Sequence, residues 1–234
     1  MLVTPIKTKV FKENEDLFAF VTRSIKKVSE RSVIVITSKI VALSEGRTAV
    51  IKNEKEKEAI IRAESEFALK TKYTWLTIKD GALLASAGID ESNADGKIIL
   101  LPKDSFEAAR AMRARLLKYY GVKKLGVLIT DSRLMPLRAG VVGVALGYAG
   151  FKGLRDYRGT PDIFGRKLKM TQTDIADGLA TAAVLPMGEG RECQPLALIT
   201  DAPIDFVDKV NKKELRISIQ DDVYGPMFRR IGKK

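Results

Sequence analysis

Four stretches of the chain have the apolar spacing or the composition of helices. The first follows Asn14-Glu15-Asp16, where a capping residue and two acids suit the positive end of a helix dipole. The second is rich in Glu, Lys and Ala, and the fourth is rich in Ala. These patterns predict helices over residues 17–28, 54–70, 106–120 and 171–185.

Short apolar runs bounded by Gly, Pro or polar residues predict strands. The turn signal Lys79-Asp80-Gly81 indicates a hairpin between two of them. The predicted strands cover residues 33–37, 73–78, 83–87, 97–101, 126–130, 140–149, 196–200 and 215–219. Because strands and helices do not alternate strictly, we expect an α+β fold with mixed, largely antiparallel sheets and flanking helices. No linker or repeat divides residues 1–234, which predicts a single unit or two closely packed subdomains.

Composition and length fit a folded globular protein. Hydrophobic residues make up 45 % and charged residues 30 % of the 234 positions. The longest apolar runs, such as Val33 to Ile36, are too short to cross a bilayer, and the first residues lack the pattern of a signal peptide. The single cysteine, Cys193, excludes an intramolecular disulfide. We therefore expect a cytoplasmic protein with no membrane segment.

The sequence contains no histidine. This excludes Ser-His and Cys-His nucleophile pairs, imidazole bases and nearly all zinc sites. A metal would have to be held by oxygen, and oxygen ligands suit Mg²⁺, Mn²⁺ or Ca²⁺. Catalysis would rest on carboxylates, lysines, arginines, backbone dipoles and such metals.

The net charge of +12 has three interpretations: solubility, an anionic small substrate, or nucleic acid. The basic residues are scattered along the chain, and no RGG tract, zinc finger or aromatic RNA-binding signature is present. We therefore do not expect nucleic acid to be a partner.

Two polar loops in the first half of the chain are candidates for phosphate or metal binding. In the first, Lys39 follows a buried strand and Ser38, and can reach a phosphate as a point charge. The Walker spacing is absent, and a surface lysine on a turn explains the pattern equally simply. In the second, residues 87–93, small and flexible residues precede Asp90. Asp90 suits a metal ligand, and Asn93 suits an amide donor to a nucleotide. An Asx-turn is the alternative.

Two further polar loops lie in the second half. Asp131 ends a hydrophobic strand and is followed by Ser132, a common way to hold Mg²⁺ against phosphate oxygens, although a cap or turn also fits. Arg133 and Arg138 follow, and can neutralise charge on a transferring phosphoryl group. The fourth loop has glycines on both sides of Glu189, which let the backbone approach an anion and leave the carboxylate free to face a metal, although a flexible surface loop is the alternative.

The segment 154–166 is dense in Arg, Asp and Gly. It can clamp a carboxylate substrate through bidentate arginines, or form a salt-bridge network at a subunit contact. The sequence leaves both interpretations open.

Seven segments, spread between residue 35 and residue 190, match the order of motifs in one family. They are VITSKIVALSEGR (35–47), AGIDESN (87–93), LLPKD (100–104), VLITDS (127–132), RAGVVGVALGYAG (138–150), LRDYRGTPDIFGRKLKMT (154–171) and ADGLATAAVLPMGEG (176–190). On these segments the chain resembles the coenzyme F(420)-0:L-glutamate ligases, also called F(420):γ-glutamyl ligases, over residues 7 to about 201.

The resemblance implies a GTP-dependent ligase that forms a γ-linked glutamyl amide with two divalent cations, Mg²⁺ or Mn²⁺. It also implies an intertwined homodimer with a family-specific α+β fold. By motif, Asp90 and Asp131 correspond to ligands of the first metal, and Ser132 and Glu189 to those of the second. The implied nucleotide contacts are Ser38, Lys39, Asn93 and the loop Met187 to Gln194, which includes Gly188, Gly190 and Arg191. Asp131 and Arg138 are our candidate catalytic residues.

The chain departs from the family at positions near the nucleotide. Leu43 stands where the family often has a lysine, and Lys7-Thr8-Lys9 replaces a glycine-proline opening, so Thr8 to Phe11 aligns only loosely. Leu134-Met135 replaces a Gly-Arg pair. These departures leave open the choice between GTP and ATP and the identity of the acidic acceptor.

The expected reaction adds L-glutamate to an acidic acceptor through an acyl phosphate. Within the same class, the alternative is a γ-glutamyl ligase that acts on another acceptor, such as a folate. From a different class, the alternative is a non-catalytic, basic nucleotide- or nucleic-acid-binding protein.

Overall fold

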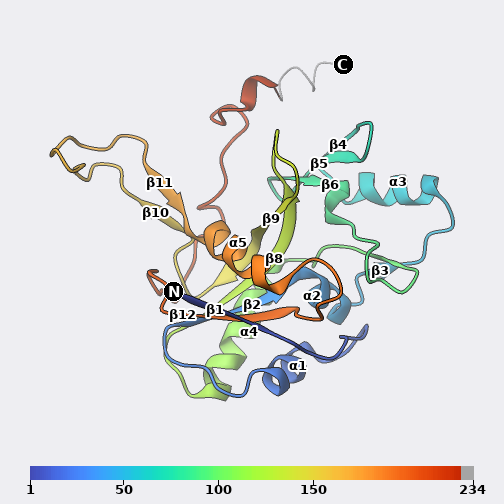
Figure 1. The fold of residues 1–234 in the computed structure, drawn as a ribbon. Coiled ribbons are helices and arrows are strands. Elements are labelled where there is room, and N and C mark those ends of the chain that lie inside the picture. Colours follow the sequence, from blue (N-terminus) through green and yellow to red (C-terminus); the bar gives the residue numbers. More distant parts are fainter. Residues whose placement is uncertain (228–234) are drawn as a thin grey trace.

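A five-stranded sheet forms the centre of the protein, whose computed structural model describes residues 1–227 (Figure 1). Its strands are ordered β1 (Leu2–Ile6), β12 (Leu196–Thr200), β2 (Ser32–Thr37), β8 (Leu125–Leu134) and β9 (Val141–Ala149). The pair β2 and β8 is parallel, and the other neighbours are antiparallel. The prediction of a mixed α+β fold with mostly antiparallel sheets and flanking helices is confirmed.

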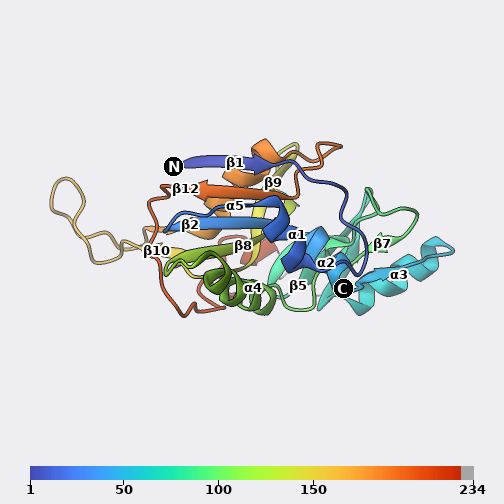
Figure 2. The same ribbon diagram turned by 90° about the horizontal axis from the view of Figure 1, so that it is seen from below.

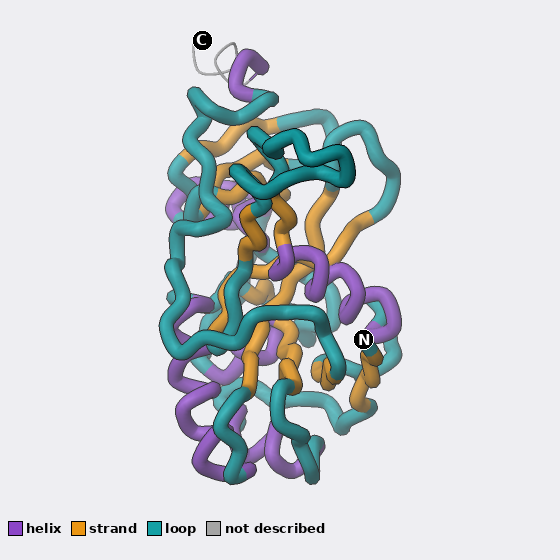
Figure 3. Tube along the Cα trace, turned by 90° about the vertical axis from the view of Figure 1, so that its left-hand side faces the viewer, coloured by secondary structure: helices purple, strands orange, loops and turns teal. Residues whose placement is uncertain are grey.

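Helices cover both faces of this sheet. In Figure 1, α1 (Leu17–Ser24) and α4 (Ser105–Tyr120) lie below it, and α5 (Ile175–Met187) lies above it. Strand β2 is buried along its length because alternate residues serve two cores: Ile34 and Ile36 pack towards α1 and α4, and Val33 and Val35 towards α5. The trace shows strands in the middle of the molecule with helices on both sides (Figure 3).

Two glycines of β9 allow α4 and α5 to pack directly on the sheet. A side-chain carbon at Gly147 would lie 2.3 Å from the backbone of Ser105, at the start of α4. One at Gly143 would lie 2.5 Å from the carbonyl oxygen of Ala180 in α5. The register of β8 and β9 shifts between Ile129 and Thr130, so the two glycines face opposite sides of the sheet although both numbers are odd.

Smaller elements surround the central sheet (Figure 2). A hairpin arm, β10 (Leu154–Asp156) and β11 (Gln172–Asp174), carries the loop 157–171 away from the body. The remaining elements are α2 (Ser38–Ser44), α3 (Glu54–Ala63), the 3-10 turn η1 (Ser86–Gly88), the sheet β4 (Phe67–Lys70), β5 (Trp75–Lys79), β6 (Ala82–Ala85), and the pair β3 (Thr48–Ala49), β7 (Ile98–Ile99). Within the described part of the chain, no helix combines the length and apolar character needed to span a bilayer.

Three predicted helices have different limits in the structure. The first ends at Ser24, because the chain is extended from Ile25 onwards. The second ends at Ala63, and its last predicted residues form β4, which pairs with β5. In the fourth, Gln172–Asp174 form β11, and the helix begins only after the cap at Asp174. In the second and fourth cases, pairing with another strand overrides local helix propensity.

Two predicted strands are wrong or much reduced. Residues 215–219 form no strand, because Ile217 and Ile219 are exposed and no partner strand lies beside them within residues 1–227. The strand predicted over 97–101 shortens to the two residues of β7. Conversely, β1, α2 and the arm strands were not predicted, because each is short and carries too little periodicity to identify.

Candidate functional site

The candidate site lies where β2 and β8 end side by side. These parallel strands pair in register up to Thr37 and Thr130, so Ser38 and Asp131 follow at the same edge of the sheet. The Ser38 hydroxyl donates to the Asp131 carboxylate at 3.3 Å. Ser38 is buried and begins α2, while Asp131 lies in the part of β8 that extends beyond β2. The arrangement places a hydroxyl and a carboxylate at the carboxyl ends of neighbouring parallel strands, a common location for ligands.

A strained turn brings Asp90 to this edge. Ser86, Ala87 and Gly88 have successive φ angles of 47°, 57° and 72°, and a side chain at Gly88 would lie 2.6 Å from Leu101. Backbone bonds in both directions between Asp90 and Ile99 then fix the position of the aspartate. Consecutive left-handed residues are costly and cluster at functional sites, which fits a role for this turn in placing Asp90.

Lys39 links the Asp90 loop to the end of β2. Its ammonium lies 2.8 Å from the Asp90 carboxylate and donates to both the carbonyl oxygen and the hydroxyl of Ser92, at 2.9 and 3.1 Å. The backbone N–H of Ser92 in turn donates to Asp90 at 2.6 Å. The structure therefore brings together Lys39 and Asp90, two residues selected from separate sequence motifs.

The loop after α5 brings Glu189 to the same place. Glu189 lies close enough to Ser132 and Lys39 for both to oppose the rise in its pKa that burial causes. Gly188 has a φ of 80°, and a side chain there would collide with Glu192, whose carboxylate accepts from the N–H of Gly190 at 2.8 Å. Glu192 thus holds the glycine-rich loop in its bent form.

Two further contacts tie the glycine-rich loop to the predicted nucleotide-contacting segments. The amide of Asn93 donates to the carbonyl oxygen of Gly190 at 3.4 Å, and the N–H of Thr8 donates to the carbonyl oxygen of Cys193 at 2.9 Å. The N-terminal stretch, the Asp90 loop and the loop 188–194 are therefore neighbours in space.

The carboxylates of this cluster affect one another. Burial first, and the negative charges of Asp90 and Glu189 in addition, raise the pKa of Asp131 to about 7, although hydrogen bonds from Ser132 and Ser38 oppose the shift. Burial also raises the pKa of Glu189. Burial acts in the same direction on Asp90, but the hydrogen bonds from Lys39 and Ser92 dominate, and its pKa is lowered. A cation bound here would relieve the mutual repulsion of these carboxylates.

The donor set fits hard divalent cations. Within residues 1–227, no three acidic or cysteine side chains converge tightly enough to form a metal site by themselves. The predicted ligand sets do not require this, because each contains two protein oxygens: Asp90 with Asp131, and Ser132 with Glu189. Mg²⁺ typically takes one or two carboxylates and completes its shell with water and substrate phosphates.

Some predicted residues lie apart from the cluster. Arg138 is exposed in the turn between β8 and β9, and in the described residues its side chain makes no ion pair. Met187 ends α5 with its side chain buried in the core, so it can offer a ligand only its backbone. Arg191 is exposed on the loop. Leu43, at the position of the missing lysine, lies in α2 and packs against the core.

The arm carries the arginine-rich segment 154–166 outwards. Arg158 pairs with Asp156 at 2.6 Å, and Arg166 with Asp162 at 3.6 Å, so these arginines are neutralised by acids of the same arm. Arg155 donates to the carbonyl oxygen of Pro203. The large apolar side chains at the tip of the arm are exposed.

The structure gives individual roles to residues for which sequence reasoning named none, two of them within the assigned loop Met187 to Gln194. Ser92 holds both Asp90 and Lys39, and Glu192 shapes the glycine-rich loop. The hydroxyl of Thr130 and the side-chain carbonyl of Gln194 are buried without a hydrogen-bond partner in the described structure, and each is adjacent to a site segment. In the sequence, only their proximity to Asp90, Asp131 and Glu189 indicates such roles.

Comparison with known proteins supports one family. A family model described as F420-0:Gamma-glutamyl ligase matches residues 5–201. The Coenzyme F420:L-glutamate ligase of Methanococcus maripaludis strain S2 is 34 % identical over 240 residues, covering 94 % of this chain and 96 % of the relative. That of Methanopyrus kandleri is 35 % identical over 213 residues, covering 83 % of both chains. That of Archaeoglobus fulgidus is 29 % identical over 94 % of both chains. The matched range includes every residue of the carboxylate cluster.

Proposed function

This chain belongs to the F420-0:gamma-glutamyl ligase family, and on that premise we propose that it joins L-glutamate to an acidic acceptor through an amide bond. The relatives' name favours coenzyme F420, or its precursor, as the acceptor. We further propose that a nucleoside triphosphate, GTP or ATP, supplies the driving force, with two divalent cations, Mg²⁺ or Mn²⁺, at the candidate site.

One observation carries this proposal: Asp90 and Glu189 lie near enough to Asp131, at the end of β2 and β8, for their charges to act on it. They come from three distant segments, yet their charges interact. Ser38 contacts Asp131 and Lys39 contacts Asp90 directly. Acids and hydroxyls beside a lysine, with no histidine in the chain, suit phosphoryl transfer, where positioning and charge neutralisation dominate catalysis.

The proposed reaction has two chemical steps. First, an oxygen of the acceptor carboxylate attacks the γ-phosphorus, the bond to the β-phosphate oxygen breaks, and the nucleoside diphosphate leaves. The product is an acyl phosphate. Second, the uncharged amine of glutamate attacks the acyl carbon, the bond from that carbon to the phosphate oxygen breaks, inorganic phosphate leaves, and the amine proton passes to solvent. The net result is that one amide bond forms for each phosphoanhydride bond that is broken.

The chain's own residues would hold and neutralise the reacting groups. Asp90 and Asp131 would hold one cation, and Ser132 and Glu189 the other. Bound there, divalent cations neutralise phosphate oxygens and align the triphosphate. Lys39 already lies at the cluster and would contact a phosphate, while Asn93 and the backbone of the loop 188–194 would contact the nucleotide. Arg138, exposed on the turn beyond β8, would have to approach the transferring group to neutralise its charge.

The arm supports the further proposal of a homodimer. Its loop exposes Ile163 at 91 %, Phe164 at 88 % and Met170 at 88 %, large apolar side chains at the end of a hairpin that leaves the body. When such side chains pack against another protein surface, their apolar surface is removed from water, which favours association. A second copy of this chain is the partner we propose for them.

An assay with an acceptor panel tests the proposed function. The purified protein is given Mn²⁺, L-glutamate, and GTP or ATP, with coenzyme F420, its glutamate-free precursor and a folate in separate reactions. We expect nucleoside diphosphate release that requires both glutamate and one acceptor, and a product heavier by one glutamyl residue in the mass spectrum. Failure to form product with every acceptor, together with salt-sensitive nucleotide or nucleic-acid binding, would favour the non-catalytic alternative.

A further inference from the structure

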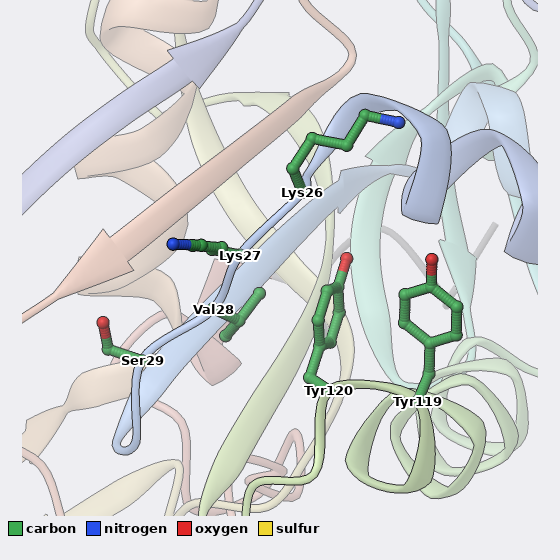
Figure 4. Close-up of a pocket in the computed structure, with 6 residues that line it drawn as sticks. All are labelled: Lys26, Lys27, Val28, Ser29, Tyr119 and Tyr120. Atoms are coloured by element: carbon green, nitrogen blue, oxygen red, sulfur yellow. The ribbon is translucent and has the colours of Figure 1, made fainter.

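A cavity at the opposite end of the sheet from the candidate site combines aromatic and basic side chains. It has a volume of about 460 Å³ and is lined by Lys26, Lys27, Val28, Ser29, Tyr119 and Tyr120 (Figure 4). Its loop precedes β2, whereas Ser38 follows β2. Six residues of strand separate the two places, a span of about 20 Å. The cavity is therefore distinct from the carboxylate cluster.

The folded chain concentrates basic residues around this cavity. Segments 25–31 and 115–124 lie against each other, because the N–H groups of Lys123 and Lys124 both donate to the Glu30 carboxylate at 2.8 Å. Glu30 is the sole acid in the two segments. Their basic residues are Lys26, Lys27, Arg31, Arg115, Lys118, Lys123 and Lys124. Within residues 1–227 none of these forms an ion pair, so their positive charge is available to an anion.

The aromatic wall of the cavity is rigid. The hydroxyl of Tyr120 donates to the carbonyl oxygen of Ile25 at 2.6 Å, which fixes the end of α4 to the lysine loop. Tyr119 contacts the rings of Tyr120 and Phe18 edge to face, at 5.0 and 5.7 Å, yet 56 % of Tyr119 remains exposed. An aromatic ring held in place beside lysines provides both a stacking surface and phosphate contacts.

We propose that this cavity binds single-stranded nucleic acid, with one base against Tyr119 and the neighbouring phosphates on Lys26 and Lys27. The cavity volume accommodates a nucleobase, and Lys118, Lys123 and Lys124 extend the positive surface beyond a single phosphate group. Basic residues that are scattered along the sequence are therefore brought together here, because two of the basic segments meet.

Fluorescence anisotropy with a labelled, non-self-complementary 12-nucleotide RNA tests this proposal on the full chain. We expect binding that weakens steeply as salt rises. Lys26→Glu combined with Lys27→Glu should weaken binding at least about tenfold, and Tyr119→Ala at least about fivefold, whereas Tyr119→Phe should bind like the wild type. Lys167→Glu with Lys169→Glu is the matched control, because it removes the same charge from the arm and should change binding less than about twofold. A DNA oligonucleotide of the same sequence, measured beside the RNA, shows whether the 2′-hydroxyl contributes to binding.

Several outcomes would overturn the proposal. Equal losses in the cavity and arm variants would indicate diffuse attraction to a basic protein. Unchanged binding by Tyr119→Ala would exclude a base at that ring. Displacement of the RNA by GTP at equal concentration would indicate a mononucleotide site. Binding to anionic lipid vesicles but not to RNA, lost in the Lys26 and Lys27 variant, would indicate a membrane contact. Circular dichroism of each variant verifies that a loss of binding does not arise from unfolding.

Discussion

The hydroxyl of Ser38 donates to the carboxylate of Asp131 at 3.3 Å, although 93 positions separate the two residues in the chain. The pairing follows from the parallel register of β2 and β8, which places the residues after Thr37 and Thr130 side by side. The buried residues of both strands drive this pairing through the hydrophobic effect. The same packing that stabilises the fold therefore positions the first two groups of the candidate site.

Asp131→Asn tests the role of the central carboxylate. Asparagine keeps the size of the side chain and can accept the Ser38 hydrogen bond, but it removes the negative charge. We expect the rate of glutamate-dependent nucleotide cleavage to fall at least about 100-fold, the scale of losing one key electrostatic group. Steady-state kinetics measures this. Asp208→Asn, whose side chain is 91 % exposed, is the control and should retain full activity.

The close contact of α4 with β9 predicts a large cost for Gly147→Ala. The added methyl group would meet the Ser105 backbone at 2.3 Å, and backbone cannot move aside cheaply. We expect a loss of about 1–3 kcal/mol in the free energy of unfolding, measured by denaturant titration. Gly178→Ala in α5 is the matched control, since no atom lies within 4 Å of the new group. Higher helix propensity should make that variant more stable by up to about 1 kcal/mol. Equal effects of the two substitutions would contradict this packing.

The side chain of Tyr120 should lose its proton at a higher pH than an ordinary tyrosine. Burial first, and the neighbouring Tyr119 second, raise the pKa of Tyr120 to about 12 from an ordinary value of 10. The folded protein therefore keeps a proton that the unfolded chain releases between these values. The resulting stabilisation is complete below pH 10 and disappears as the pH rises through 12. Phenolate absorbance of the wild type minus that of Tyr120→Phe should show a titration near pH 12, and a difference centred near pH 10 would refute this.

The homodimer proposal predicts that the arm determines the oligomeric state. Ile163→Asp combined with Phe164→Asp should convert a species of twice the 25.8 kDa chain mass into one of the single-chain mass, measured by light scattering. Charged residues at an apolar contact must lose water without gaining a partner, which opposes association. Val50→Asp, at an exposed position of the body, should leave the mass unchanged. A wild type of single-chain mass at all concentrations would end the proposal.

Candidate site residues could be selected from local sequence signals more readily than the smaller elements. Asp131 follows a hydrophobic strand, Glu189 lies between glycines, and small residues precede Asp90. Their meeting also depends on register: β2 must pair with β8, and the loop after α5 must return to Ser132. Periodicity identifies a buried strand but not its neighbour, so the resemblance to a family, and not the pattern, supplied the grouping.

The elements that sequence reasoning missed are short or depend on distant partners. Strand β4 has the composition of the helix before it and is extended because it pairs with β5. Strand β1 is formed largely by pairing with β12, almost two hundred positions later. The basic cavity is a similar case, because Lys26 and Tyr119 lie on different segments and meet only through Glu30 and Ile25. Long-range pairings of this kind leave no local pattern.

The most direct test of the proposed ligase site is a titration of Mn²⁺ in the presence of a non-hydrolysable GTP analogue. Electron paramagnetic resonance of free Mn²⁺ gives the number of ions bound to each chain. We predict about two ions per wild-type chain, with at least one lost in Asp131→Asn and in Asp90→Asn. If both variants bind Mn²⁺ with the stoichiometry and affinity of the wild type, the carboxylates at the end of β2 and β8 do not form the metal site, and the proposed mechanism is wrong.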